Sequence, residues 1–133
     1  MRAKGGTSRG QKPGSLEAHE RLVAECLEEL ALMGFAAWEN PRRAVQVNGR
    51  WVSLTKAGRG DIQVLLARQA EGRLFGIHGE VECKTGQSGQ SPKQRAHMRM
   101  VRNSGGVYIV ARDRNEMRAE LELIGFAARL PAA

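Results

Sequence analysis

The sequence has few of the features on which several protein classes depend. It contains two cysteines, Cys26 and Cys83, each isolated among apolar neighbours, so we expect small core residues rather than a disulfide framework. No apolar run approaches the roughly 20 residues that a membrane-spanning helix needs. The basic N-terminal residues are followed by no apolar stretch of a secretory signal. These absences predict a cytoplasmic protein with no membrane partner.

Repeats and zinc motifs are also missing. The three histidines, His19, His78 and His97, are scattered without the Cys/His spacing of a zinc site. At 133 residues, with 41% hydrophobic and 26% charged residues, the chain has the size and composition of one ordinary folded domain. Residues 1–14 hold four Lys or Arg, four Gly and almost nothing apolar. We therefore expect a flexible basic tail at 1–14 and a folded domain at 15–133.

Acidic residues are outnumbered. Twenty-one Lys and Arg face fourteen Asp and Glu, which gives a net charge of +7. This balance favours a polyanionic partner, and nucleic acid is the first candidate. The alternative is a basic surface that serves solubility alone, and charge does not separate a nuclease from a passive binder.

The apolar pattern predicts both helices and strands. Apolar residues recur at three- and four-residue steps from Leu16 to Met33, which predicts a helix that starts at a Ser15 cap and ends near Gly34. Ser91 and Pro92 open a second helix that ends at the glycines 105–106, and Glu116 to Ile124 forms a third. Strands are predicted at 35–38, on both sides of Asn48-Gly49, and at 61–67, 74–84 and 107–111. The order indicates an α/β fold with a mixed central sheet flanked by helices.

The chemistry concentrates at Glu82-Cys83-Lys84. Side chains alternate along a strand, so Glu82 and Lys84 share a face, roughly 6.6 Å apart along the chain, while Cys83 points to the core. If 61–68 and 74–84 form a hairpin, Asp61 lies near Glu82. The glycines before Asp61 would let the backbone approach a nucleic acid strand closely.

Two carboxylates beside a lysine suit phosphodiester hydrolysis. Mg²⁺ binds one or two carboxylates together with waters and the substrate phosphate, and it activates a bound water. Lys84 can orient that water or neutralise charge in the transition state. The alternative is a solvated charge pair, which an E-x-K sequence on a strand usually forms.

These segments resemble a known family. AGRGDIQVLL (57–66), GEVECKTG (79–86), SPKQ (91–94) and GGVYIVA (105–111) are similar to the PD-(D/E)XK nuclease superfamily, and within it to the stand-alone VRR-NUC domains of phages and bacteria. The resemblance implies a restriction-endonuclease-like αβββαβ core and Mg²⁺-dependent cleavage of DNA, with Mn²⁺ as a substitute. It also implies homodimers that act on branched DNA such as Holliday junctions. One departure is Gly60, where the family often has proline.

The resemblance also assigns roles to residues. Asp61 and Glu82 would bind the metal, Lys84 would orient the water, and Gln94 would help to position water and phosphate. Gln94 has an alternative role, because Ser91-x-x-Gln94 is also a capping box. The superfamily usually adds a carboxylate from its first helix; Glu20 is favoured and Glu17 is the alternative, while an exposed helix glutamate is the simpler interpretation.

DNA contacts and self-association are the remaining expectations. Basic residues near the site are candidates for phosphate contacts, with a solvated face as the alternative: Lys56, Arg59, Lys93, Arg95 and Arg99. The apolar residues around Asn48-Gly49 could form a dimer interface, or they could pack on the domain's own sheet. The competing function is a non-catalytic DNA-binding module that retains the nuclease fold.

Overall fold

The computed structural model describes residues 15–41, 44–53 and 58–127. The expected tail at 1–14 and Lys56 lie outside this part. Within it, none of the helices is long and apolar enough to cross a bilayer. The elements in chain order are α1 (Ser15–Leu32), β2 (Ala36–Glu39), β3 (Ala44–Val47), β4 (Arg50–Ser53), β5 (Ile62–Ala70), β6 (Arg73–Cys83), α2 (Pro92–Asn103), β7 (Val107–Ala111) and α3 (Arg114–Leu123).

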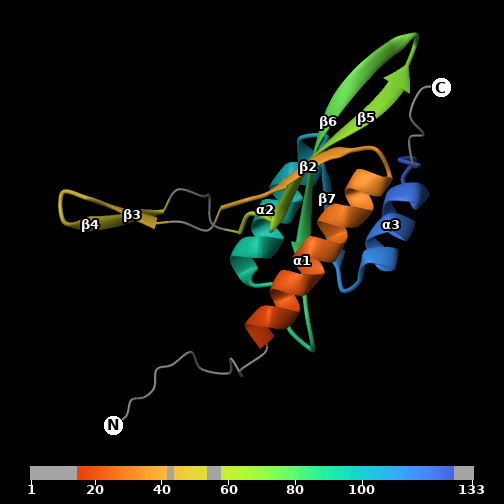
Figure 1. The fold of residues 1–133 in the computed structure, drawn as a ribbon. Helices are drawn as coiled ribbons and strands as arrows, with labels where there is room; N and C mark the ends of the chain where they lie inside the picture. Colours follow the sequence, from red (N-terminus) through yellow and green to blue (C-terminus); the bar gives the residue numbers. More distant parts are fainter. Residues whose placement is uncertain (1–14, 42–43, 54–57, 128–133) are drawn as a thin grey trace.

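The central sheet is mixed. Its strand order is β2-β5-β6-β7; β2, β5 and β6 are antiparallel neighbours, and β7 runs parallel to β6. The parallel pair needs a crossover connection, and α2 supplies it. Figure 1 shows helices on both sides of this sheet. The predicted α/β class is therefore confirmed, and α1, β2, β5, β6, α2 and β7 follow one another in the expected αβββαβ order.

The apolar core lies between the sheet and the helices α1 and α3. The apolar stripe of α1 is fully buried at Cys26, Leu30 and Met33. It packs in one cluster with sheet and α3 residues: Ile62, Val64, Leu66, Val81, Cys83, Met117 and Leu121. Both cysteines are buried in this core, as the sequence predicts. The α2 face of the sheet is different, because β6 presents polar side chains to it.

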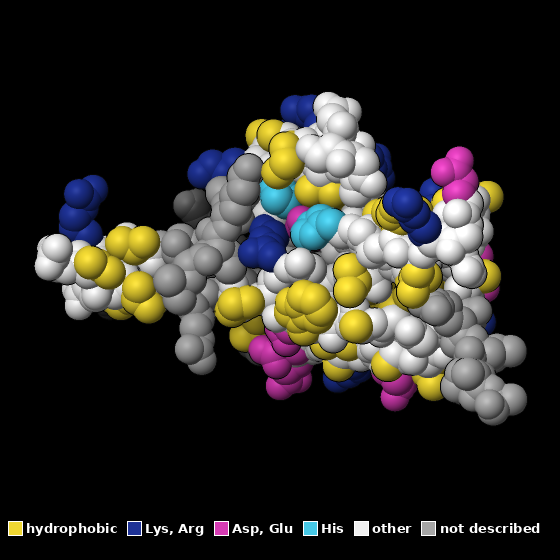
Figure 2. Space-filling model, turned by 90° about the horizontal axis from the view of Figure 1, so that it is seen from above, with side chains coloured by type: hydrophobic (Ala, Val, Ile, Leu, Met, Phe, Trp, Pro, Cys, Tyr) yellow, Lys and Arg dark blue, Asp and Glu magenta, His cyan; other side chains and the backbone are white. Residues whose placement is uncertain are grey.

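The hairpin β3–β4 forms a separate two-stranded sheet. Asn48 and Gly49 have positive φ angles of 51° and 77°, the conformation that a two-residue hairpin turn requires and that Asn-Gly adopts readily. The ribbon projects from the body of the protein (Figure 1), and hydrophobic side chains lie along it (Figure 2). One of the two alternatives that the sequence left open was packing on the domain's own sheet. The hairpin instead forms a sheet of its own, separate from the central sheet.

A buried glutamate joins α1 to α3. Glu29 accepts hydrogen bonds from Arg114 Nε at 2.9 Å and from Arg118 Nη1 at 2.8 Å. Burial by itself raises the pKa of Glu29, but the hydrogen bonds from Arg118 and Arg114 outweigh burial and leave this pKa below its ordinary value. The ionised carboxylate therefore stabilises the packing of the two helices.

Replacing Glu29 should expose this contribution. Glu29→Gln should lower the free energy of unfolding by roughly 1–3 kcal/mol near neutral pH, because charge-assisted hydrogen bonds are lost. A depressed pKa means that the stabilisation is complete above the ordinary carboxyl pKa and disappears as the pH falls through the folded-state value. Urea denaturation over a pH series should show the two proteins converging in acid. Glu28→Gln is the control: it also removes an ion pair with Arg114, but an exposed one, and should cost less. A constant gap between Glu29→Gln and the parent protein would contradict the account.

Candidate active site

Strand β6 buries two carboxylates on its α2 face. Glu80 and Glu82 are 2% and 1% exposed, and they share this face because they are two residues apart. An ionised carboxylate is costly to bury unless charges or hydrogen bonds compensate it. The groups around these two side chains therefore define what the site is.

Glu82 is held from two sides. Tyr108 Oη, from β7, donates a 2.7 Å hydrogen bond to its Oε1, and Gln90 Nε2 donates a second at 3.1 Å. The other oxygen, Oε2, lies 3.2 Å from Lys84 Nζ as an ion pair. Among the described residues, Oε2 accepts no hydrogen bond although it is buried. Glu82 thus keeps one oxygen beside a lysine with acceptor capacity to spare.

Lys84 and Gln94 are brought together across the site. Lys84 Nζ donates to Gln94 Oε1 at 2.9 Å. The same amide oxygen accepts the Ser91 backbone N–H at 2.8 Å, and the Ser91 hydroxyl accepts the Gln94 N–H, which completes the capping box of α2. The two roles considered for Gln94 are therefore compatible, since the cap itself fixes the oxygen that Lys84 contacts.

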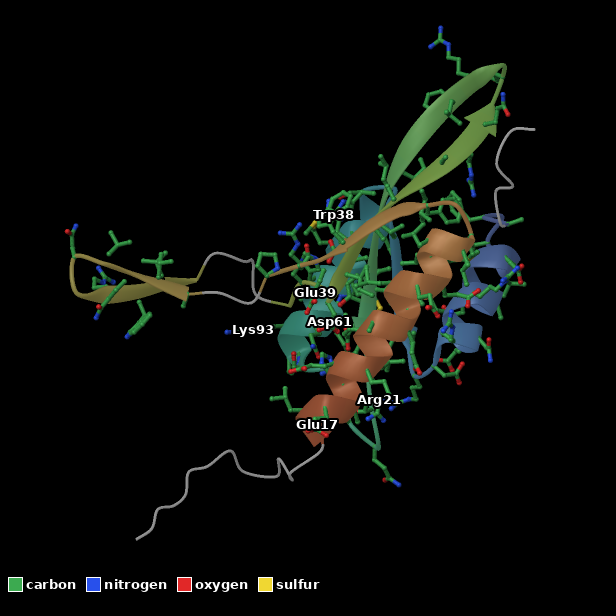
Figure 3. All side chains as sticks on the ribbon, in the orientation of Figure 1. Glu17, Arg21, Trp38, Glu39, Asp61 and Lys93 are labelled. Carbon is green, nitrogen blue, oxygen red and sulfur yellow. The ribbon has the colours of Figure 1, made fainter. Side chains whose placement is uncertain are left out.

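Asp61 stands at the start of β5, level with Glu82. Ile62 pairs with Val81 in the antiparallel register. Asp61, one residue before Ile62, is therefore opposite Glu82, one residue after Val81. Asp61 is 3% exposed, and its Oδ2 accepts the backbone N–H of Cys83 at 2.7 Å. Figure 3 marks Asp61 in the body of the protein and Lys93 at the start of α2.

Tyr108 reports how closely the acids converge. Burial raises the pKa of its hydroxyl, and so do its hydrogen bond to Glu82 and the charges of Glu82, Glu80 and Asp61. Three carboxylates therefore act on one phenol, which stays protonated as a permanent hydrogen-bond donor. Only the pairing of β6 with β7 reveals the contact with Glu82, because the two residues are 26 positions apart in the sequence.

The first helix contributes a histidine to the site. His19 Nε2 lies 3.3 Å from Asp61 Oδ1, and the His19 side chain is 28% exposed. Glu17 and Glu20, the expected carboxylates of this helix, are both exposed. In the sequence, His19 has neither the carboxylate expected from this helix nor the spacing of a zinc ligand, so nothing there points to this contact.

Glu80 is the centre of a second cluster. His78 Nε2 lies 2.7 Å from its Oε2, His97 Nε2 lies 2.9 and 3.0 Å from the two oxygens, and the Gly60 N–H donates to Oε1 at 2.9 Å. Burial raises the pKa of Glu80, but the hydrogen bonds from His78, Gly60 and His97 outweigh it and lower this pKa. The missed signal was the run of polar residues at every second position of a strand, His78, Glu80, Glu82 and Lys84.

The glycines before Asp61 bring this loop against α2. Gly58 has a φ of +85°, and a Cβ there would lie 2.3 Å from the Lys93 carbonyl oxygen. The close approach at Gly58 is therefore to the helix backbone, whereas the sequence suggested an approach to nucleic acid. Together with the Gly60–Glu80 hydrogen bond, it fixes the segment that leads into Asp61.

The candidate phosphate-binding residues surround this centre to different degrees. Lys93, Arg95 and Arg99 are exposed on α2. Arg95 Nη1 donates to the Gln90 carbonyl at 2.7 Å, and Arg59 donates to Gln63 Oε1 on β5. The basic side chains of α2 thus lie on the helix that covers Glu82, and Arg59 lies two residues before Asp61.

The chemistry of the donors bears on metal binding. In the described part of the chain, no group of three or more His, Cys, Asp or Glu side chains is arranged to hold a metal ion. Mg²⁺ needs fewer protein ligands, because it is usually bound by one or two carboxylates and retains several waters. Asp61 and Glu82 supply two carboxylates on neighbouring strands, and the spare Oε2 of Glu82 fits such an ion.

Adding a methyl group at Gly58 should test the contact between the loop and α2. Gly58→Ala should destabilise the fold by more than the roughly 1–2 kcal/mol of a left-handed backbone alone, because the new Cβ also collides with the Lys93 carbonyl. Gly105→Ala is the matched control, since Gly105 has a φ of +90° and nothing within 4 Å of its added Cβ. Thermal unfolding would compare the two, and equal losses would show that the close approach does not matter.

Two features of this site indicate the chemistry that it suits. Two carboxylates stand on neighbouring strands, and a lysine lies beside one of them, an arrangement that suits phosphodiester hydrolysis with a divalent cation. No protein-family model, no curated protein and no solved structure matches the chain.

Proposed function

We propose that this protein is a Mg²⁺-dependent endonuclease that hydrolyses phosphodiester bonds of DNA. The observation that carries the proposal is the placement of Glu82, which is buried and oriented by Tyr108. Its second oxygen lies beside Lys84 and accepts no hydrogen bond from the part of the chain that the structure describes. A passive DNA-binding surface gains nothing from buried acids at this position, because they repel phosphate. Acids are needed where a cation must be held.

Each residue has a role that follows from its contacts. Asp61 and Glu82 would hold the ion, which when bound would polarise the phosphoryl oxygen and favour ionisation of water. Lys84 is held between Glu82 and Gln94, so its ammonium can orient the attacking water or neutralise charge that develops on the phosphate. The hydrogen bond from Tyr108 orients the Glu82 carboxylate, and His19 lies next to Oδ1 of Asp61.

The substrate is proposed to be a polymer, and branched DNA in particular. A net charge of +7 and the exposed cations on α2 favour a polyanion over a single nucleotide. The preference for branches is an analogy with the VRR-NUC group of the PD-(D/E)XK superfamily, to which we propose that this chain belongs. The order αβββαβ of the core agrees with that placement.

We further propose that two copies act together through the β3–β4 hairpin. One active site cuts one strand per encounter, so paired cuts in a junction need a second copy, and a two-fold axis is the commonest way to supply it. Four apolar side chains of the hairpin are exposed to solvent. Trp51 is 71% exposed and Val47 is 47% exposed, and the exposed fractions of Val52 and Val45 are slightly smaller. A two-stranded ribbon by itself is marginally stable in water, which favours a partner that covers it.

The cleavage reaction is tested directly on plasmid and branched DNA. Purified protein should nick or cut with Mg²⁺ or Mn²⁺, do nothing in EDTA, and bind with little cutting in Ca²⁺. Asp61→Asn, Glu82→Gln and Lys84→Met should each reduce the single-turnover rate by about a hundredfold or more, because each removes a charge that would hold the ion or act on the reacting phosphate.

The controls separate chemistry from folding. Glu120→Gln changes an exposed acid on α3 and should leave the cleavage rate as it is. Circular dichroism and thermal unfolding should show that the three site variants stay folded. A folded Asp61→Asn or Glu82→Gln protein with full activity would overturn the assignment.

Association through the hairpin is tested by mass. Light scattering at micromolar concentration should give about twice the 14.6 kDa chain mass. Trp51→Glu should shift the protein to monomer, because it places a charge on the apolar ribbon, whereas Gln69→Glu, at an exposed position on β5 outside the hairpin, should not. Paired cuts in a four-way junction should be lost together with the dimer. A monomer that still makes paired cuts would contradict the hairpin interface.

A further inference from the structure

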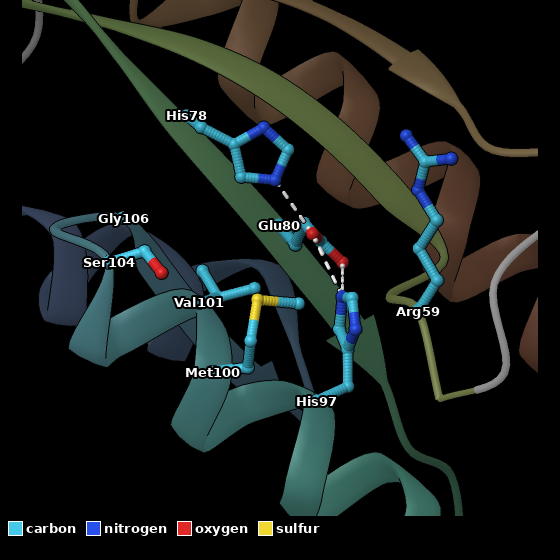
Figure 4. A pocket seen from close by; sticks show the side chains of 8 residues that line it. All are labelled: Arg59, His78, Glu80, His97, Met100, Val101, Ser104 and Gly106. Atoms are coloured by element: carbon cyan, nitrogen blue, oxygen red, sulfur yellow. Dashed lines mark hydrogen bonds and ion pairs between the residues drawn. The ribbon is translucent and has the colours of Figure 1, made fainter.

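A pocket of about 320 Å³ opens beside the proposed active site, between β6 and α2 (Figure 4). Figure 2 shows histidine and acidic side chains together in a hollow on one face, with Lys or Arg next to them. The lining is mixed, with polar groups from β6 and the loop before β5, and apolar ones from α2: Arg59, His78, Glu80, His97, Met100, Val101, Ser104 and Gly106. The proposed hydrolysis uses none of these side chains.

The polar wall of the pocket is one chain of hydrogen bonds. Arg59 donates to Gln63 Oε1, and Gln63 Nε2 lies 3.5 Å from His78 Nδ1. His78 and His97 both contact the Glu80 carboxylate through Nε2, as the dashed lines in Figure 4 mark. Each contact requires a proton on Nε2, since a carboxylate only accepts. The wall is therefore prearranged, and its donors already point at Glu80.

Both oxygens of Glu80 already accept hydrogen bonds, so the unused acceptor of this wall is on His97. A neutral His97 that donates from Nε2 retains a lone pair on Nδ1. The His97 side chain is 5% exposed, and its Nδ1 has no hydrogen-bond partner among the described residues. A buried polar atom without a partner is uncommon in a folded protein and calls for an explanation. A ligand that donates a hydrogen bond would provide one.

The pocket also has a defined position along the substrate path. Glu80 precedes Glu82 by two residues on the same face of β6, which is roughly 6.6 Å along a strand and comparable to the length of one nucleotide. Glu80 also bonds the N–H of Gly60, the residue before Asp61. A DNA strand that followed β6, with its scissile phosphate at Asp61 and Glu82, would place a neighbouring nucleotide at the mouth of the pocket.

We infer that the pocket binds a nucleobase turned out of the DNA stack next to the cleaved phosphate. The inference deepens the proposed function and relies on it for the class of ligand. A planar base would pack its apolar face against Met100 and Val101 and form hydrogen bonds through its polar edge with Glu80 and His97. Extruded bases are held in this way. Arg59, at the rim, carries the charge that the attached phosphate needs.

The acceptors of the wall favour bases that carry an amino group. Adenine and cytosine present an N–H₂ donor on the Watson–Crick edge. Thymine presents carbonyl oxygens on both sides of its single N–H, and these would face the Glu80 carboxylate. The pocket should therefore discriminate against thymine by roughly two- to tenfold, the effect of one net hydrogen bond.

The chain's three histidines allow a test that needs no catalysis. Two of them, His78 and His97, line the pocket, whereas His19 contacts Asp61 and serves as an internal control. The ring signals of all three would be followed by NMR in metal-free buffer while 2′-deoxyadenosine, 2′-deoxycytidine or thymidine is added to about 10 mM, a range that covers a Kd near 1 mM. The inference predicts saturable shifts of His78 and His97, a steady His19, and weaker binding of thymidine.

A pair of variants at the rim completes the test. Met100 is 41% exposed, so its replacement should leave the fold intact. Met100→Trp should fill the pocket and abolish the shifts, and Met100→Leu should retain them. Equal shifts of all three histidines, or no saturable shift of His78 and His97, would overturn the inference. A parent protein that responds to nucleosides as predicted but does not cleave DNA would contradict the proposed hydrolysis. The inference about the pocket would then still hold.

Discussion

The burial of two carboxylates on a single strand is the constraint on which the α2 half of the molecule depends. Glu80 and Glu82 are almost fully buried, and each would be costly to keep ionised without compensation. The groups packed around them supply it: His97 from α2, Tyr108 from β7 and Lys84 at the end of β6. The helix, the parallel strand and the loop before Asp61 are held in place by the same polar contacts.

The sheet therefore separates two layers with different purposes. On the α1 and α3 side, Leu30, Met33 and Leu121 form an apolar cluster whose stability comes from burial. On the α2 side, the contacts are directional and charged, and they position side chains. A protein with this division can change the polar layer while the opposite layer maintains the fold, as other folds do when unrelated sites are built on one scaffold.

The sequence predicted the elements better than it predicted the contacts between them. The apolar stripe of α1, the Asn48-Gly49 turn and the Ser91 capping box depend on residues close in sequence, so local patterns located them. The register of β5 against β6 placed Asp61 level with Glu82, as a hairpin of that length requires. His97 with Glu80 joins residues 17 positions apart on different elements, and no periodicity signals it. Whether His19 or Glu20 lies next to Asp61 depends on the rotation of α1 against the sheet. The apolar stripe of α1 fixes this rotation only coarsely.

The start of β5 and the end of β6 are bonded to each other in both directions. The Gly60 amide donates to Glu80, and the Cys83 amide donates to Asp61. Each carboxylate is thus anchored by the backbone of the strand next to it, and the anchoring is complete before any ligand arrives. The conformational entropy of these side chains is lost once, during folding. For a cation that bound there, the carboxylates would have few rotamers left to lose, so more of the interaction energy would remain as affinity.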